Sequence, residues 1–268
     1  MKLRVQQVLS RSSSDSARTP HTRRDQVKIL DIQSSPRGES SDSIILTKSF
    51  IEACKSNNTL IVVDTLNVWH ERLPEFDHET IGAKYKARKH ETMTQAESKV
   101  WERIQSLIQR FQNADRIVLG TPMWNFSLPY KLKHLIDLVA QRNFLFTYDG
   151  KQYGPLLNVE KAVVVYTRGS RYLEGTPISP SRFDYQATYL DFWLRLIGVR
   201  NLRSVIVDNA WNRDLHESEV SLAKGKATLE GLVEWFLTSS AAAATPMPRP
   251  ALSYSVNREF SNAHRVGG

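Results

Sequence analysis

Residues 117–129 read Ile117-Val118-Leu119-Gly120-Thr121-Pro122-Met123-Trp124-Asn125-Phe126-Ser127-Leu128-Pro129, and the rest of the chain is interpreted outward from them. The stretch opens with an apolar, β-branched run. Pro122 lacks a backbone donor and biases Thr121 toward extended geometry, so a strand is expected to end there. Trp124 and Phe126 then stand at the carboxyl end of a parallel strand, which is where open α/β sheets bind ligands. The other interpretation, that the two rings only plug the top of the sheet, stays open at this point.

Further apolar runs on both sides of this stretch alternate with helical patterns. Strands are expected over residues 27–32, 60–63, 116–121, 161–166 and 204–207. Helices are expected after residue 43, after the capping box formed by Thr94 and Glu97, and over residues 130–142, 185–197 and 218–237. Residues 67–90 are expected to be an irregular excursion, and the aromatics around Asp149-Gly150 predict a hairpin. Strands that alternate with helices predict a parallel, doubly wound sheet.

The two ends of the chain differ in composition from its centre. Residues 1–26 are rich in Ser and Arg, and residues 241–268 turn to Ala, Pro, Ser and Asn. Both segments are expected to be disordered, because such compositions bury too little apolar surface to fold, which leaves one domain over residues 27–240. A basic, Ser-rich start is also compatible with an organelle transit peptide, but we favour a cytoplasmic protein with a plain disordered extension.

The net charge of +8 does not indicate nucleic-acid binding once it is divided along the chain. Residues 1–26 hold six Lys and Arg against two Asp and Glu, and residues 240–268 hold three Arg against Glu259, so +2 remains for residues 27–239. This near-neutral centre does not support a face that binds DNA or RNA. No apolar run approaches membrane-spanning length. The single cysteine, Cys54, excludes an internal disulfide and a cysteine metal cluster, and the histidines show no metal-ligand spacing.

The first expected strand runs directly into a hydroxyl-rich loop, which reads Gln33-Ser34-Ser35-Pro36-Arg37-Gly38-Glu39-Ser40-Ser41-Asp42-Ser43. A helix follows it, and the N-terminus of a helix offers unpaired N–H groups and the positive end of a dipole to an anion. One of these serines could simply cap the helix. The loop supplies more hydroxyls than a cap needs, which favours phosphate binding. It is neither a nucleoside-triphosphate loop nor a dinucleotide fingerprint, since both glycine patterns are missing.

Three loops therefore stand at strand carboxyl ends, over Ser34–Ser43, Pro122–Phe126 and Thr167–Ser170. In a flavodoxin-like sheet of order 2-1-3-4-5, strands one, three and four adjoin the point where the order reverses. The sequence thus predicts a five-stranded flavodoxin-like sheet with helices on both faces, whose loops converge on one ligand. Their chemistry matches FMN: hydroxyls suit the phosphate, the aromatic and amide loop suits the ring, and the glycine-containing turn suits the pyrimidine edge.

These strings resemble those of the FMN-dependent NADH-azoreductases and their NAD(P)H:quinone oxidoreductase relatives, over roughly Val27 to Leu237. The matching strings are Ser34-Ser35-Pro36-Arg37-Gly38 with Ser41-Asp42-Ser43, Pro122-Met123-Trp124-Asn125-Phe126 followed by Leu132-Lys133 and Asp137, and Thr167-Arg168-Gly169-Ser170. Two positions depart from the family pattern. Members often carry Tyr where Trp124 stands and Gly where Ser170 stands.

The resemblance implies three groups of FMN-binding residues. They are Ser35, Ser41, Asp42 and Ser43 for the phosphate and ribityl end, Met123, Trp124, Asn125 and Phe126 for the ring, and Thr167, Arg168, Gly169 and Ser170 for its pyrimidine side. Asn125 would support the chemistry near N5 and O4 of the flavin. No side-chain nucleophile or acid–base triad is required, because the isoalloxazine carries the reaction.

The implied function is hydride transfer from NADH or NADPH through FMN to a planar quinone or azo compound, in a ping-pong mechanism. A homodimer is implied as well, in which the flap of one chain would lie over the flavin of the other. Flap-like segments near the ring supply aromatic surface for it: Phe144, Phe146, Tyr148, Tyr153 and Phe183. The alternative class is a non-enzymatic electron carrier of flavodoxin type. Such carriers meet their partners with acidic surfaces, whereas this central domain is slightly basic. A cysteine phosphatase on the same fold would need a cysteine in the first loop, and Cys54 lies in the helix.

Overall fold

The sheet has the predicted number of strands and the predicted order. The computed structural model describes residues 26–58, 60–172, 175, 179–210 and 215–239. Its main sheet holds five parallel strands in the order β2-β1-β3-β6-β7. The strands are β1 (Val27–Gln33), β2 (Ile61–Asn67), β3 (Arg116–Pro122), β6 (Val159–Thr167) and β7 (Val199–Val207). The flavodoxin-like topology expected from the sequence is confirmed.

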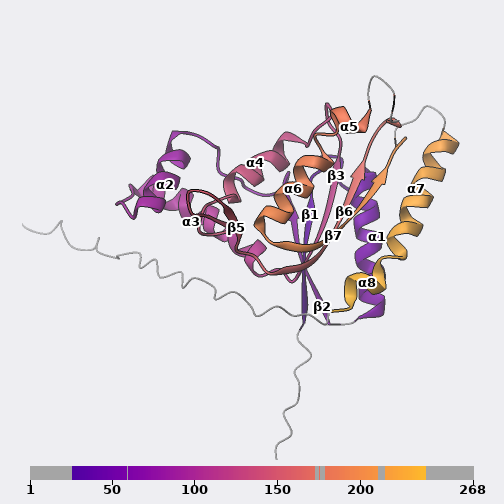
Figure 1. Cartoon of the computed structure of the whole chain (residues 1–268), viewed down its shortest axis with the longest axis horizontal. Helices are drawn as coiled ribbons and strands as arrows, with labels where there is room; N and C mark the ends of the chain where they lie inside the picture. The colour runs from indigo at the N-terminus through magenta and orange to yellow at the C-terminus, as the bar shows by residue number, and fades with distance from the viewer. Residues whose placement is uncertain (1–25, 59, 173–174, 176–178, 211–214, 240–268) are drawn as a thin grey trace, which may run out of the picture.

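Helices cover both faces of this sheet (Figure 1). One face carries α1 (Asp42–Asn57), α7 (Leu215–Glu230) and α8 (Val233–Leu237), and the other carries α3 (Gln95–Gln112), α4 (Tyr130–Val139) and α6 (Ala187–Ile197). Alternate strand residues serve the two faces: Ile29 and Val118 join the core under α1, while Leu30 and Ile117 join the core under α3. A sheet buried on both sides explains why its strands read as continuous apolar runs.

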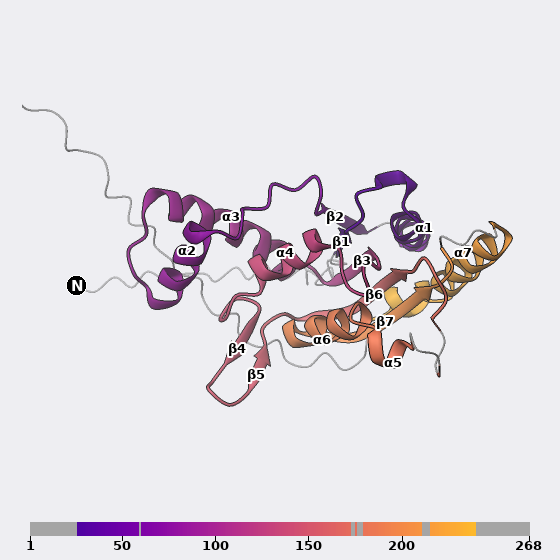
Figure 2. The same ribbon diagram turned by 90° about the horizontal axis from the view of Figure 1, so that it is seen from above.

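The expectation that residues 67–90 are irregular is wrong, because they contain α2 (His78–Lys89). The Asp77 carboxylate caps this helix by accepting from the Thr80 N–H at 3.0 Å. Only small residues are buried on it, namely Thr80, Ala83 and Ala87, and most of the remaining positions hold polar or charged residues. A stripe that narrow gives little periodic signal in the sequence. The helix packs against α3 and stands away from the sheet (Figure 2).

Several other boundaries differ from expectation. The capping box of Thr94 and Glu97 is confirmed at the start of α3. The helix expected over residues 130–142 ends at Val139, and the helix expected over residues 185–197 begins at Ala187, after the short α5 (Pro180–Phe183). The last expected helix, residues 218–237, is two helices, α7 and α8, joined by a turn that contains Gly231.

The predicted hairpin is present as β4 (Phe146–Tyr148) and β5 (Tyr153–Pro155). It lies away from the ring site of its own chain. The hairpin follows the C-terminal end of α4, and the Leu157 N–H after it bonds the Ile197 carbonyl at the C-terminal end of α6, so its base lies toward the amino-terminal edge of the sheet. It projects beside α6 in Figure 2. Phe144, one of the residues expected to supply aromatic surface in the flap, is buried against Trp101.

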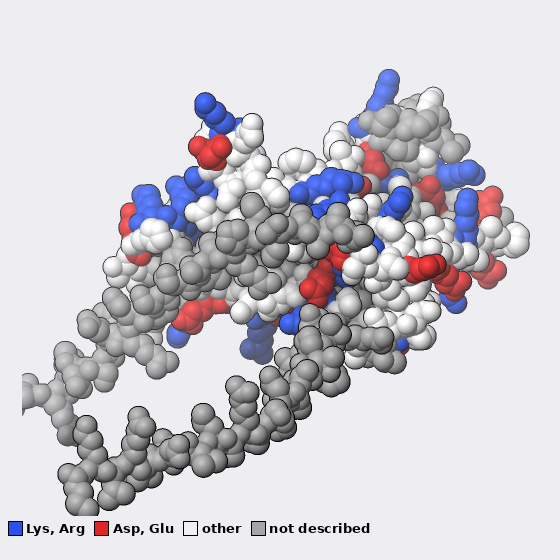
Figure 3. Space-filling view, turned by 60° about the horizontal axis from the view of Figure 1, so that its bottom comes forward, with Lys and Arg blue, Asp and Glu red and all other residues white. Residues whose placement is uncertain are grey.

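The segments expected to be disordered, residues 1–26 and 241–268, lie outside the described residues except for Gln26. Within the part of the chain that the structure describes, no helix is long and apolar enough to cross a membrane. Lys and Arg are interspersed with Asp and Glu over the described part of the face shown in Figure 3.

Candidate functional site

The three predicted loops meet at the carboxyl-terminal edge of the sheet, where backbone hydrogen bonds join them. The Ser34 N–H and hydroxyl both donate to the Gly120 carbonyl, at 3.1 and 3.0 Å, which ties the first loop to β3. The Met123 N–H donates to the Thr167 carbonyl at 2.8 Å, which ties the second loop to the third. A Cβ on Gly120 would lie 2.7 Å from the Ser43 carbonyl oxygen, so only glycine allows β3 to pass this close to the start of α1.

The hydroxyl-rich loop brings its serines to the N-terminus of α1. A short 3-10 turn (Gly38–Ser40) leads into Ser41, the N-cap of α1, whose side chain makes no capping hydrogen bond. The Ser41 and Ser43 hydroxyls lie 3.1 Å apart, and the Ser35 hydroxyl accepts from the Arg37 N–H at 3.3 Å. The interpretation that one serine serves only as a side-chain cap is therefore not supported. What the loop offers is hydroxyls beside the positive end of a helix.

The second loop is a tight turn over residues 124–127. Trp124 and Ser127 exchange two backbone hydrogen bonds of 2.9 Å, and the residues between them, Asn125 and Phe126, both have positive φ values of 48° and 66°. Two successive left-handed residues define a type I′ turn, which normally takes Asn or Gly at both positions. Asn125 tolerates this conformation, whereas Phe126 is strained in it. Such strain is typical of functional sites, and here it turns an amide and a phenyl ring outward at the sheet edge.

The third loop contributes mainly backbone, because the side chain of its arginine turns inward. Arg168 is only 3% exposed, and its guanidinium forms an ion pair with Asp184 and donates to Gln186 Oε1 at 3.4 Å. Thr167 is also buried, while Gly169 is half-buried and Ser170 exposed. The structure thus brings all three predicted groups to one edge. It directs the Arg168 side chain into the protein and leaves the glycine turn accessible.

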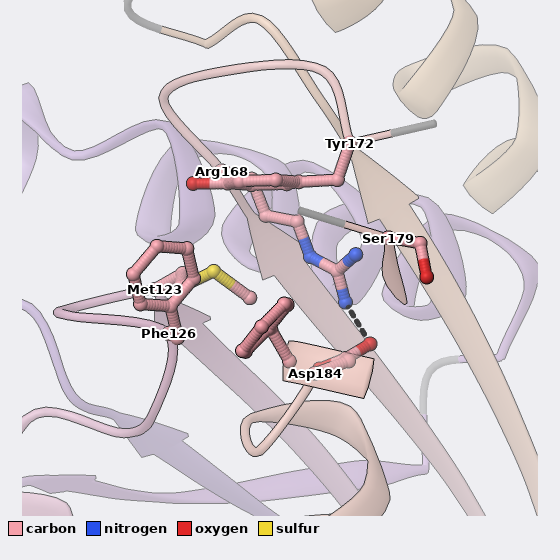
Figure 4. A pocket seen from close by; sticks show the side chains of 7 residues that line it. Met123, Phe126, Arg168, Tyr172, Ser179 and Asp184 are labelled. Carbon is pink, nitrogen blue, oxygen red and sulfur yellow. Dashed lines mark hydrogen bonds and ion pairs between the residues drawn. The ribbon is translucent and has the colours of Figure 1, made fainter. Parts of the chain in front are cut away.

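A small hollow opens beside the second and third loops (Figure 4). The Arg168–Asp184 ion pair lies against one side of it, and three aromatic rings crowd the other. The Phe126 ring centroid lies 6.0 Å from that of Tyr172 and 6.1 Å from that of Phe183. The hollow is lined by Met123, Phe126, Arg168, Tyr172, Ser179, Phe183 and Asp184. At about 10 Å³ the hollow has room for about one water molecule, so a flat ring would lie beside it, against the aromatic side chains.

The segment between α5 and α6 holds these loops, and its role was not predicted. The Tyr185 N–H donates to the Phe126 carbonyl at 3.1 Å, and Gln186 Nε2 donates to the Thr121 carbonyl at 3.2 Å. The Asp184 carboxylate pairs with Arg168 and also accepts from the Ala187 N–H at 2.8 Å. An Asp three residues before the first residues of a helix is a sequence signal of a helix start, and this signal could have identified Asp184.

Besides Asp184, Trp69 is a residue of this edge that the sequence did not predict. It follows β2 directly, contacts the first two loops and lies at the same sheet edge. The carboxyl-terminal ends of parallel strands meet at one edge, but this strand was expected to end at Val63, whereas β2 continues to Asn67 and brings Trp69 to that edge.

Burial raises the pKa of a carboxyl at this edge. The Asp208 carboxyl, directly after β7, has its pKa raised above the usual range by burial, an effect that the nearby guanidiniums of Arg168 and Arg171 partly oppose. Across the described residues there is no group of three or more His, Cys, Asp or Glu side chains placed to hold a metal ion. The edge combines hydroxyls, amides and backbone N–H groups with charged side chains such as Arg168, Asp184 and Asp208.

Comparison with known proteins agrees with this geometry. Residues 27–230 match the family model described as having a flavodoxin-like fold. The chain is 50% identical over 192 residues to FMN-dependent NADH:quinone oxidoreductase 2 of Burkholderia lata, covering 72% of this chain and 93% of that protein. It is 38% identical over 182 residues to FMN-dependent NADH:quinone oxidoreductase 3 of Pseudomonas fluorescens, covering 68% of this chain and 84% of that one.

Solved structures show the same fold. An azoreductase from Bacillus anthracis (Sterne) superposes with a TM-score of 0.71 at 24% identity, covering 78% of this chain and all of that one. An FMN-dependent NADH-azoreductase from the Ames Ancestor strain, solved in complex with FMN, has a TM-score of 0.67 at 24% identity, covering 77% and 99%.

The fold and the loop-lined edge thus define a protein of the flavodoxin-like class. Within that class, the chain belongs to the family of the FMN-dependent NADH:quinone oxidoreductases. The family resemblance drawn from the sequence strings is confirmed.

Proposed function

We propose that this protein binds FMN at the carboxyl-terminal edge of its sheet and reduces quinones or azo compounds with NADH or NADPH. The observation that carries the proposal is the convergence of the Ser34–Ser43 loop, the 124–127 turn and the Thr167–Ser170 turn, joined by backbone hydrogen bonds. The names of the relatives support the same cofactor and reaction class.

The donor set of the first loop fits a phosphate. Hydroxyls of Ser41 and Ser43 gather at the N-terminus of α1, where a dianion is stabilised by the unpaired N–H groups of the first turn and by the helix dipole. The Ser41 and Ser43 side chains are both buried, so their hydroxyls would reach a phosphate after a small shift of the loop. Ser35, Ser41, Asp42 and Ser43 would hold the phosphate and ribityl end.

The second and third loops fit the flavin ring. Met123, Trp124 and Phe126 supply partly exposed apolar surface for stacking, and the exposed Asn125 amide would bond the polar edge of the ring. The accessible turn at Gly169 lets backbone N–H groups approach the pyrimidine side. Bound FMN supplies the chemistry of this class of enzyme, accepting a hydride from a pyridine nucleotide and passing electrons to an acceptor.

The residues of the chain then bind and orient the reactants. Phe126, Tyr172 and Phe183 form an aromatic wall beside the ring site, and such a wall admits a flat molecule while excluding water. We further propose a homodimer in which the hairpin of one chain, with Tyr148 and Tyr153 stacked at 4.6 Å, covers the ring site of the partner. The hairpin lies away from the ring site of its own chain, so a partner's site is the one it would serve.

One kinetic experiment tests the proposal. One sample of purified full-length protein is denatured and the released flavin identified. The folded protein is examined by sedimentation, and its initial rates are measured over a grid of NADH and quinone concentrations. We expect stoichiometric FMN, a dimer in sedimentation, and parallel double-reciprocal lines, because one narrow slot must hold donor and acceptor in turn. Release of FAD, or no uptake of FMN, would contradict the cofactor proposal. Intersecting lines would contradict the shared slot alone.

A further inference from the structure

We propose that Trp69 is a positioning residue that locks the phosphate-side loop and the ring-side loop of the flavin site together. This inference rests on the proposed function, since it concerns residues of the same site. Trp69 belongs to neither loop. It lies in the connection after β2 and contacts the first loop through its indole N–H and the second through its ring.

The contact with the first loop is a hydrogen bond. Trp69 Nε1 donates to the Ser34 carbonyl at 2.9 Å. Ser34 is fully buried, and its N–H and hydroxyl are both directed at the Gly120 carbonyl. The indole therefore fixes the Ser34 carbonyl from the side opposite to β3. That carbonyl belongs to the peptide that enters Ser35, so its orientation sets where the hydroxyl-rich loop begins.

The contact with the second loop is aromatic. The Trp69 ring centroid lies 5.9 Å from that of Trp124 at an interplanar angle of 51°, and 5.4 Å from that of Tyr130 at 86°. Both spacings fall in the range of favourable aromatic pairs. Trp124 opens the strained 124–127 turn and Tyr130 begins α4. Trp69 thus supports the turn from the side of β2.

Trp69 is itself held in place from below. Its backbone N–H donates to Asn67 Oδ1 at 3.0 Å. Asn67 Nδ2 in turn donates to Gln33 Oε1 at 3.3 Å, and Gln33 Nε2 donates to Asp31 Oδ2 at 2.8 Å. This polar chain crosses β1 and β2 and ends on a buried carboxylate. Two residues further along the connection, Glu71 pairs with Arg103 and Arg110 of α3. A side chain carried by a backbone segment that is anchored at two points is suited to positioning others.

Two ligands can distinguish the two contacts of Trp69. Its indole N–H acts on the loop that would hold the phosphate, and its ring acts on the turn that would face the isoalloxazine. FMN carries the phosphate, whereas riboflavin carries the same ring without it. Removal of the indole N–H should therefore weaken FMN binding more than riboflavin binding, because riboflavin keeps the ribityl chain but lacks the phosphate. Removal of the ring should weaken both.

The experiment titrates FMN and riboflavin into flavin-free full-length protein, following the quenching of flavin fluorescence. For Trp69→Phe we expect the FMN dissociation constant to rise about three- to tenfold, as expected for one lost hydrogen bond, and the riboflavin constant to rise less. For Trp69→Ala we expect both constants to rise. Thermal unfolding of each flavin-free variant is measured alongside.

Trp193→Phe is the matched control. Trp193 is a buried tryptophan of α6 whose Nε1 has no hydrogen-bond partner among the described residues, so the same substitution removes no bond there. It should lower the unfolding temperature without changing the ratio of the FMN and riboflavin constants. If Trp69→Phe leaves that ratio unchanged, as the control does, Trp69 only packs and the inference is overturned. If the unsubstituted protein binds neither flavin, the proposed function fails as well.

Discussion

The Ser41 and Ser43 hydroxyls, 3.1 Å apart at the first turn of α1, are the smallest unit on which the proposed chemistry depends. Ser41 occupies the N-cap position without capping through its side chain, and Ser43 is buried one position into the helix. A structural role would make these serines matter to stability, whereas a phosphate role would make them matter to affinity. The two roles predict different measurements on the same variant.

Ser43→Ala should weaken FMN binding about tenfold or more, because a hydrogen bond to a charged phosphate contributes roughly 1.5–3 kcal/mol. The free energy of unfolding of the flavin-free protein should change by less than about 1 kcal/mol. Flavin titration beside thermal unfolding measures both. Ser40→Ala is the control: Ser40 is exposed in the preceding 3-10 turn and should change neither quantity. A loss confined to stability would assign Ser43 to the helix alone.

At the scale of elements, the 124–127 turn combines an unusual backbone with the side chains proposed to face the flavin. Asn125 at φ 48° sits where a type I′ turn accepts glycine equally well. Backbone geometry and amide chemistry can therefore be separated by one substitution. The same holds for Asn143, at φ 68°, which lies in the connection between α4 and the hairpin.

Asn125→Gly should keep the turn and lose the amide. The free energy of unfolding should stay within about 1 kcal/mol of the unsubstituted value, because glycine adopts positive φ freely. Turnover with NADH and a quinone should fall about tenfold, the effect of one hydrogen bond to a charged or polarised ring edge. Steady-state kinetics and thermal unfolding measure the two effects. Asn143→Gly, with the same backbone demand far from the site, should leave turnover unchanged. Equal turnover in both variants would remove Asn125 from the site.

The sequence predicted the elements whose signal is local. The five strands could be identified because apolar runs such as Val163-Val164-Val165 are continuous, and their order followed from the loops expected to converge. The small buried face of α2, formed by residues such as Ala83, left no periodic pattern. Contacts that depend on tertiary placement, such as Gln186 with the Thr121 carbonyl or Trp69 with the Ser34 carbonyl, leave no trace in spacing along the chain.

At the scale of the whole molecule, the three loops and the residues that hold them all fall within residues 27–239. The Burkholderia lata relative has 93% of its length aligned to 72% of this chain. The parts of this chain outside the alignment therefore have little counterpart there. We propose that residues 1–26 and 241–268 do not take part in the chemistry.

A chain of residues 27–240 should bind FMN with unchanged stoichiometry and keep turnover with NADH and a quinone within about twofold of the full-length protein. The reason is that every contact described between the loops arises inside this range. Flavin content after purification and steady-state rates measure the outcome, with the full-length protein as the control. Loss of flavin from the shortened chain would show that an end segment contributes to the site.

Helix α2 is packed less extensively than the rest of the domain. Its main packing contact is with α3, through a close approach at Gly82, where a Cβ would lie 2.7 Å from Glu97 Oε1, and through the Lys86–Glu97 ion pair at 2.7 Å. The sheet and its covering helices, by contrast, share two extensive cores. Because few apolar side chains of α2 are buried, we expect this helix to open in a low-energy, sub-global unfolding step. We expect the strands that carry the loops to exchange their amide protons only when the whole domain opens.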